Sequence, residues 1–221
     1  MKFKAIIFDM DGTILDTEHI WESATEKLIL KKGFEYTDDL KKEITALNKG
    51  NTMHTCCQNI KNVLQLPENI DDIVAEKTLL AKELYRNDVN FINGFNDFHI
   101  ESQNQKLTTA LATNADCDFL GIMKKRLSLD KLFGQHIYNP SNVNFVAKPS
   151  PDLFLYTADR LETNPKECIV IEDSEAGIAA AKSAGMYCIG INTGKNKDLL
   201  QQSDFIIDEY KEINLKKIIK K

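Results

Sequence analysis

Asp9 and Asp11 stand directly behind an apolar run at residues 5–8 and are followed by Gly12 and Thr13. In an extended segment, residues two apart point the same way, so the two carboxylates can face one site. Two like charges at short range repel each other unless a cation or a shared proton offsets the repulsion. The pair is therefore a candidate for metal binding and for carboxylate chemistry.

Polar residues also follow two later apolar runs. Thr113 and Asn114 end one of these runs, and Glu172 and Asp173 end the other. Lys148 lies in a loop between them. The carboxyl ends of parallel strands share one edge of a sheet, so all of these side chains can meet the first aspartate pair there.

This set of side chains suits phosphoryl transfer. A carboxylate can attack phosphorus and carry the group as an acyl phosphate. A second carboxylic acid can protonate the leaving oxygen and later deprotonate water. Hydroxyl, backbone N–H and ammonium groups neutralise the equatorial oxygens, and Mg²⁺ screens the carboxylates from the incoming dianion.

The elements that must position these residues can be predicted from apolar patterning. The run at residues 5–8 predicts a strand buried on both faces, because a half-buried strand would alternate polar and apolar residues. Beyond residue 88, strand and helix signals alternate, which predicts an α/β fold with a Rossmann-like parallel sheet and helices on both faces. Ser150 and Pro151 predict the start of a helix, with Ser150 as its cap. The further expected strands are residues 107–112, 136–138, 168–171, 187–191 and 205–207, the last of them at an edge.

The segment between the first motif and this alternating part has a different pattern. Apolar residues recur there at helical spacing, with no strand signal. The helical stripes run through residues 20–28, 40–47, 53–63 and 70–84. We therefore expect a discontinuous α/β core, formed by residues 1–16 and 88–221, with an all-helical insert at residues 17–87.

The sequence Asp-Met-Asp-Gly-Thr at residues 9–13, behind an N-terminal apolar strand, resembles the first motif of the haloacid dehalogenase-like hydrolase superfamily. Three later motifs resemble those of the family in the same order: Thr-Asn at 113–114, Lys-Pro-Ser-Pro-Asp at 148–152 and Glu-Asp-Ser-Glu-Ala-Gly at 172–177. The resemblance covers nearly the whole chain. The Glu-Asp form and the helical insert look most like the branch that contains β-phosphoglucomutase and related sugar-phosphate phosphatases.

The resemblance implies a role for each matching residue. Asp9 matches the nucleophile and Asp11 the acid/base of a Mg²⁺-dependent phosphatase that works through an aspartyl-phosphate. Thr113 and Lys148 match catalytic residues that also bind phosphate, together with the backbone of Asn114. The implied metal ligands are Asp9, Asp11, Glu172 and Asp173. The helical insert resembles a cap that closes over the active site.

Two departures from the family pattern bear on the reaction. Family mutases carry an arginine in the cap just beyond a Lys-Gly pair, and the stretch that begins at Lys49 and Gly50 places Met53 there. They also carry a histidine five residues after the aspartate of an Asp-Thr pair, where this sequence has Trp21. A mutase must hold a phosphate at both ends of its substrate, so we expect a phosphatase rather than a phosphohexomutase of the β-phosphoglucomutase type. The dehalogenase branch fits less well, since those enzymes lack the second aspartate, which Asp11 supplies here.

Two alternatives belong to another class of function. A phospho-receiver domain also uses an acidic pair, a phosphorylated aspartate, a threonine and a lysine, but such domains are far smaller and have no helical insert. A non-catalytic, phosphate-responsive binding module could have kept the fold, although all of the motif residues are present. A phosphatase assay with Mg²⁺ separates either alternative from an enzyme.

Composition sets the remaining expectations. The 221 residues carry a net charge of -5, which gives no sign of a nucleic-acid-binding surface. The cysteines, at positions 56, 57, 117, 168 and 188, lack the spacing of a zinc site and resemble buried thiols of a reducing compartment. No apolar stretch approaches the roughly 18 residues of a spanning helix. We expect a cytoplasmic monomer that acts on a small phosphorylated metabolite and binds neither nucleic acid nor membranes.

Overall fold

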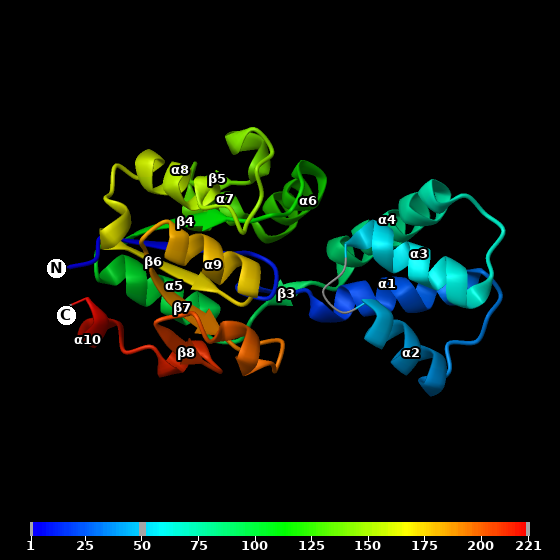
Figure 1. The fold of residues 1–221 in the computed structure, drawn as a ribbon. Helices are drawn as coiled ribbons and strands as arrows, with labels where there is room; N and C mark the ends of the chain where they lie inside the picture. The colour runs from blue at the N-terminus through cyan, green and yellow to red at the C-terminus, as the bar shows by residue number, and fades with distance from the viewer. Residues whose placement is uncertain (1, 49–51, 220–221) are drawn as a thin grey trace. The chain divides into compact units, whose positions relative to one another are not determined.

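The computed structural model describes residues 2–48 and 52–219, which Figure 1 traces from blue to red. The strands are β1 (Ala5–Phe8), β2 (Leu15–Asp16), β3 (Asn90–Phe91), β4 (Thr108–Ala112), β5 (Ile137–Tyr138), β6 (Cys168–Glu172), β7 (Tyr187–Ile191) and β8 (Phe205–Ile207). The α-helices are α1 (Glu18–Lys31), α2 (Asp38–Asn48), α3 (Met53–Leu64), α4 (Ile70–Asn87), α5 (Phe95–Asn104), α6 (Cys117–Leu127), α7 (Leu129–Phe133), α8 (Asp152–Arg160), α9 (Glu175–Ser183) and α10 (Leu215–Ile218). Short 3₁₀ helices are η1 (Pro140–Val143), η2 (Pro165–Glu167), η3 (Lys197–Leu200) and η4 (Tyr210–Glu212).

The main sheet has the strand order β5-β4-β1-β6-β7-β8, and every pair in it is parallel. β1 lies between β4 and β6, with Ile7 opposite Ala110 on one side and Val170 on the other. All of β1 is buried, as its unbroken apolar run predicts. The predicted α/β class, the parallel sheet and the edge position of β8 are confirmed.

Helices cover both faces of the sheet because β1 presents apolar side chains to each of them. Ala5 and Ile7 join a buried cluster with residues of α8 and α9. On the other face, the Phe8 ring lies 5.5 Å from that of Phe95 in α5 and 5.9 Å from that of Phe133 in α7. The strand that precedes Asp9 is thus fixed from both sides.

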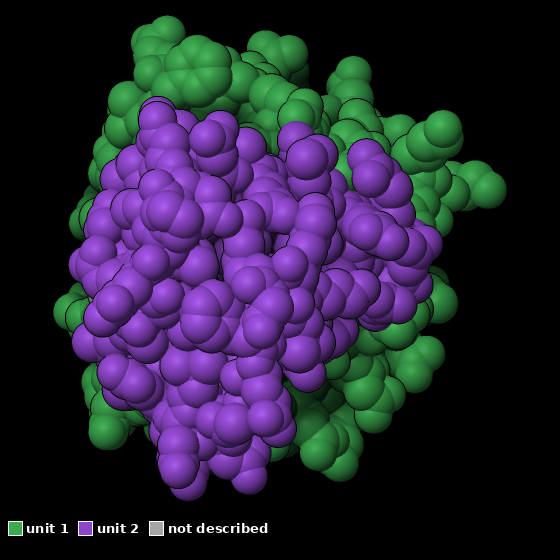
Figure 2. All heavy atoms as spheres, turned by 90° about the vertical axis from the view of Figure 1, so that its right-hand side faces the viewer, with its two compact units in different colours: residues 1–18, 89–221 green, residues 19–88 purple. Residues whose placement is uncertain are grey.

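The chain divides into two compact units, which Figure 2 colours green and purple. Unit 1 consists of residues 1–18 and 89–221, and unit 2 of residues 19–88. Unit 2 contains α2, α3, α4 and nearly all of α1, whose apolar stripes form a hydrophobic cluster of their own. In unit 1, β2 and β3 pair as a short antiparallel ladder where the chain leaves for unit 2 and returns from it.

Some elements differ from the sequence-based expectations. The strands β2 and β3 were not predicted, since two residues are too few for an alternating pattern. Helix α5 was missed as well, because its buried stripe includes His99 and Ser102 beside phenylalanines. The prediction that Ser150 caps a helix is wrong: Pro151 occupies the cap position without a side-chain cap bond, and the Ser150 hydroxyl donates to the Asp152 carboxylate instead.

None of the helices within the described residues combines the length and the apolar character that crossing a membrane would require.

Candidate active site

The turn after β1 places the first acidic motif at the carboxyl edge of the sheet. Asp9 follows the strand directly, is only 7% exposed, and donates its backbone N–H to the Ile171 carbonyl at 3.0 Å. Gly12 has a φ of 80°, and a Cβ at this position would lie 2.7 Å from Cγ of Asp173. Glycine is required here both for the backbone conformation and for the close approach of a carboxylate.

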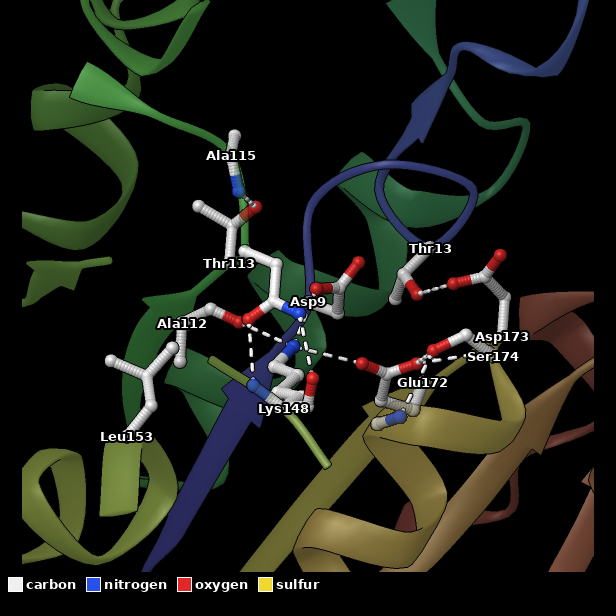
Figure 3. A network of polar contacts seen from close by, with 12 residues as sticks. Asp9, Thr13, Ala112, Thr113, Ala115, Lys148, Leu153, Glu172, Asp173 and Ser174 are labelled. Carbon is white, nitrogen blue, oxygen red and sulfur yellow. Dashed lines mark hydrogen bonds and ion pairs between the residues drawn. The ribbon is translucent and has the colours of Figure 1, made fainter. Parts of the chain in front are cut away.

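Lys148 lies at the centre of the site, as Figure 3 shows. Its Nζ donates to Asp9 Oδ1 at 2.6 Å, to Glu172 Oε1 at 2.8 Å and to the Ala112 carbonyl at 2.8 Å. These acceptors match the three hydrogens of an ammonium group. They come from the ends of β4, β1 and β6, so the lysine joins three neighbouring strands of the sheet.

The electrostatics of this group follow from burial and from its neighbours. Burial alone would lower the pKa of the Lys148 ammonium, but the carboxylates of Asp9 and Glu172 raise it above its ordinary value. Burial raises the pKa of Asp9 well above its ordinary value; Lys148 opposes this shift, while Glu172 and Asp173 add to it. Burial is therefore the main obstacle to ionising Asp9, and the neighbouring carboxyl groups add to it.

Asp173 stands on the other side of the turn after β1. Its Oδ1 accepts a hydrogen bond from the Thr13 hydroxyl at 3.0 Å. Burial, and then the charge of Glu172, raise the pKa of Asp173 to about 8. The ordinary value is 3.8, so this carboxyl group stays protonated at neutral pH unless a cation is bound nearby.

Glu172 is fixed by hydrogen bonds at both of its oxygens. Oε1 accepts from Lys148, and Oε2 accepts from the backbone N–H of Ser174 at 2.9 Å and from its hydroxyl at 2.8 Å. The Ser174 hydroxyl also accepts from the Gly177 N–H, which caps α9 as predicted. A Cβ at Gly177 would overlap the Glu172 carboxylate. In the sequence, Gly177 ends the motif at residues 172–177 and stands inside an alanine-rich helix, where alanine would be the better helix former.

The end of β4 carries Thr113 and Asn114. Thr113 is buried, and its hydroxyl accepts from the Ala115 N–H at 3.0 Å. The Asn114 side chain accepts from the Lys148 N–H at 3.0 Å and donates to the Lys148 carbonyl at 3.3 Å. The residues predicted to bind phosphate are thus neighbours of the lysine.

The carboxylates form a group that suits a metal ion. Asp9, Glu172 and Asp173 each offer one oxygen, and these oxygens lie within 4.8 Å of one another. Mg²⁺ prefers such hard oxygen ligands. Burial is the main cause of the raised pKa values of Asp9 and Asp173, and a bound cation would favour the charged forms of both carboxyl groups. The residues present therefore fit a divalent cation. Asp11, which was also predicted to be a ligand, is not part of this group; it is half-buried and forms a backbone bridge with Leu15.

Two further residues hold the turn after β1 and were missed by the sequence analysis. The Thr193 hydroxyl donates to the Gly12 carbonyl at 2.6 Å, and the Tyr210 hydroxyl donates to the Thr13 carbonyl at 2.9 Å. Tyr210 is almost fully buried. Both lie more than 180 positions along the chain from the residues that they hold, so no local pattern could have identified them.

The residues that bear on mutase chemistry lie in unit 2. Met53 begins α3 and is half-buried. Its sulfur accepts a hydrogen bond from the Cys57 thiol, with 3.8 Å between the two sulfur atoms. The Trp21 ring lies 6.0 Å from the Tyr85 ring. Lys49 and Gly50, the pair from which the expected position of the mutase arginine is counted, lie outside the described residues.

Comparison with known proteins gives consistent matches. A family model described as haloacid dehalogenase-like hydrolase matches residues 6–191. The phosphorylated carbohydrates phosphatase of Thermotoga maritima is 28% identical over 201 residues, which cover 87% of this chain and 88% of the relative. The β-phosphoglucomutase of Bacillus subtilis is 28% identical over 204 residues, covering 87% and 84% of the two chains. The crystal structure of a putative β-phosphoglucomutase from Thermotoga maritima has a TM-score of 0.83 and 25% identity, covering 98% of this chain and 100% of that chain.

Proposed function

The chain belongs to the haloacid dehalogenase-like hydrolase family, and from this premise we propose that it is a Mg²⁺-dependent phosphatase that acts on a small phosphomonoester. The membership confirms the family resemblance and the prediction of an enzyme of this hydrolase class. The observation that best supports the proposal is the buried contact of Lys148 with Asp9 and Glu172, beside the carboxyl group of Asp173. In the proposed reaction, this contact brings the nucleophile, a cation and the candidate metal ligands together.

In the proposed reaction, a side-chain oxygen of Asp9 attacks phosphorus, and the bond from phosphorus to the leaving oxygen breaks. Asp11 gives its proton to that oxygen, which leaves as an alcohol. Asp11 then takes a proton from water, which attacks the aspartyl-phosphate, so that inorganic phosphate departs and the Asp9 carboxylate is restored.

Other residues bind and neutralise the transferred group. The Lys148 ammonium, the Thr113 hydroxyl and the backbone N–H of Asn114 are the proposed partners of the phosphate oxygens. Asp9, Glu172 and Asp173 would hold the metal ion, with Asp11 as a further predicted ligand. When bound, Mg²⁺ supplies positive charge that screens the carboxylates from the phosphate dianion.

We propose that unit 2, residues 19–88, which overlaps the predicted insert at residues 17–87, serves as the cap and contacts the leaving group. The substrate class that we propose is phosphorylated sugars or similar small esters, because the relatives named above are a phosphatase of phosphorylated carbohydrates and a phosphoglucomutase. A cytoplasmic location and a monomeric state remain predictions from the sequence.

The test is the release of inorganic phosphate from a panel of sugar phosphates, nucleotides and small phosphorylated acids. We expect turnover of at least one sugar phosphate with Mg²⁺ and none with excess chelator. Turnover of no compound in the panel would favour a non-catalytic binding module, and undiminished turnover in chelator would exclude the metal-dependent mechanism.

A phosphohexomutase is the second candidate, because one of the relatives named above is a β-phosphoglucomutase and the similar crystal structure is that of a putative β-phosphoglucomutase. The residues Met53 and Trp21, in place of the expected arginine and histidine, favour hydrolysis. We therefore expect β-glucose 1-phosphate, incubated with a catalytic amount of the bisphosphate, to give free phosphate rather than glucose 6-phosphate. Efficient formation of the 6-phosphate would restore the mutase assignment.

Asp173 provides a prediction about stability in the absence of metal. Its pKa is about 8 in the folded protein and near 3.8 when unfolded, so the folded state retains a proton between these values that the unfolded state has lost. The stabilisation is complete below about pH 4 and disappears as the pH rises through 8. In chelator, the melting temperature should fall between pH 5 and pH 9. Asp9 shifts in the same direction and adds to the slope.

The matched variant is Asp173→Asn, which keeps an acceptor for the Thr13 hydroxyl. It should show a shallower decline with pH and, at pH 8 in chelator, be at least as stable as the wild type. Mg²⁺ at a hundredfold excess over Kd should stabilise the wild type by about 2.7 kcal/mol and the variant far less. A metal-free variant that is markedly weaker than the metal-free wild type at pH 8 would show that Asp173 supports the fold instead.

A further inference from the structure

We propose that the side chain of Asn114 is a positioning residue for Lys148. This inference deepens the proposed phosphatase function and rests on it. It assigns to the Asn114 carboxamide a role distinct from that of its backbone N–H, which we propose to bind phosphate.

The contact is a two-point bridge between segments that lie 34 residues apart. Oδ1 of Asn114 accepts from the Lys148 N–H at 3.0 Å, and Nδ2 donates to the Lys148 carbonyl at 3.3 Å. The carboxamide therefore satisfies both the N–H and the carbonyl of Lys148, as the backbone of a paired β-strand would. Neither Asn114 nor Lys148 lies in a strand.

The residues at the carboxyl end of β4 thereby hold both the ammonium group and the backbone of Lys148. The Ala112 carbonyl accepts from Nζ at 2.8 Å, while Asn114, two positions later, holds the backbone. The turn that carries Asn114 is itself fixed, since Asn139 Nδ2 donates to the Ala115 carbonyl at 3.1 Å. The bridge thus ties Lys148 to a segment whose position is set independently of the lysine's charge contacts.

Lys148 lies in a loop, so its backbone lacks the regular hydrogen bonds of a helix or strand. Residues 144–151 lie between η1 and α8, and the two loop residues Asn144 and Phe145 both have positive φ angles, of 53° and 62°. The flexible four-carbon stem of a lysine does not by itself fix the ammonium when the backbone shifts. A backbone shift would move Nζ relative to Asp9, and misplacement of a reacting group by about 1 Å can cost on the order of 10²-fold in rate.

The experiment compares Asn114→Ala with the wild type and with Asn164→Ala. Alanine at position 114 keeps the backbone N–H and removes only the bridge. Asn164 is a matched control because it is exposed, its Oδ1 accepts from the Lys166 N–H at 2.9 Å, and it precedes the amino end of β6, away from the site. Asn114→Asp keeps the acceptor for the Lys148 N–H but loses the donor, so it should be intermediate.

The first readout does not depend on turnover. Brief acetylation with an amine-reactive reagent, followed by mass spectrometry of the Lys148 peptide, measures how well the ammonium is held. Lys148 is only 6% exposed, so it should react slowly in the wild type and in Asn164→Ala. In Asn114→Ala it should react several-fold faster, with the other lysines unchanged. Equal protection in all three proteins would overturn the inference.

The second readout is steady-state kinetics on a substrate from the panel. Asn114→Ala should lose about 10- to 100-fold in kcat, with a melting temperature close to that of Asn164→Ala. A purely structural role would instead lower the melting temperature and leave kcat per folded molecule unchanged, which would contradict the inference. If the wild type itself releases no phosphate, the proposed function fails. The acetylation result still tests whether the Asn114 side chain positions Lys148.

Discussion

Phosphate release should fall to background when Asp9 is replaced by asparagine, while the protein stays folded, and this is the largest effect that we expect from the site. The amide keeps the size of the side chain and an acceptor for Lys148, but it cannot attack phosphorus as a carboxylate does. Asp11→Asn should lose about 10² to 10⁴-fold, the usual contribution of general acid–base catalysis. Phosphate release with Mg²⁺, circular dichroism and melting curves measure these effects.

The matched control for this series is Asp159→Asn, which makes the same change of charge at an exposed position of α8. It should retain wild-type turnover. The assignment of Asp9 as nucleophile would be refuted by full turnover of Asp9→Asn. It would be weakened equally if Asp159→Asn lost as much activity as Asp9→Asn, because the effect would then follow net charge.

Gly177→Ala should destabilise the protein and inactivate it, against the usual behaviour of helical glycines. In an open helix, glycine to alanine stabilises by about 0.5–1 kcal/mol. At position 177 the new Cβ would overlap the Glu172 carboxylate, which is held by Lys148 and by Ser174. Displacing that carboxylate should cost about 1–3 kcal/mol, as overpacking does. Activity should fall by at least about 10²-fold, because the position of Lys148 changes.

Gly121→Ala is the control for this prediction. Gly121 lies in α6, is exposed, and a Cβ there meets nothing within 4 Å. The substitution should be neutral or stabilising, with unchanged turnover. Urea unfolding and phosphate release distinguish the two variants. A Gly177→Ala protein as stable and active as Gly121→Ala would mean that α9 and Glu172 move apart without consequence.

The parts of the fold that the sequence predicted are those in which local pattern and final environment agree. Residues 5–8 and 168–171 are unbroken apolar runs, and each became a buried strand that ends in carboxylates. Parallel topology then explains why Asp9, Glu172 and Asp173 meet, and why Lys148 reaches them from a loop.

The parts that were not predictable depend on contacts over a long separation or on shape. Tyr210 and Thr193 act on the first motif from the far end of the chain, and neither belongs to a pattern. The need for glycine at position 177 arises only when Glu172 turns towards Lys148 and packs on the helix. Asp11 matches the family as a metal ligand, but the sequence spacing did not reveal that the acidic group would form without it.

The short ladder of β2 and β3 holds side by side the two segments that precede and follow unit 2 in the sequence. Leu15 lies opposite Phe91 and Asp16 opposite Asn90. Both strands belong to unit 1, so their spacing is set without reference to the residues between them. Such a pair of ends can be closed by a hairpin turn, or can accept another inserted domain, without a change in the path of the core. Recombination at this ladder would therefore exchange the whole insert and keep the core, and under the proposed role of unit 2 such an exchange would change the substrate without a change in the hydrolytic centre.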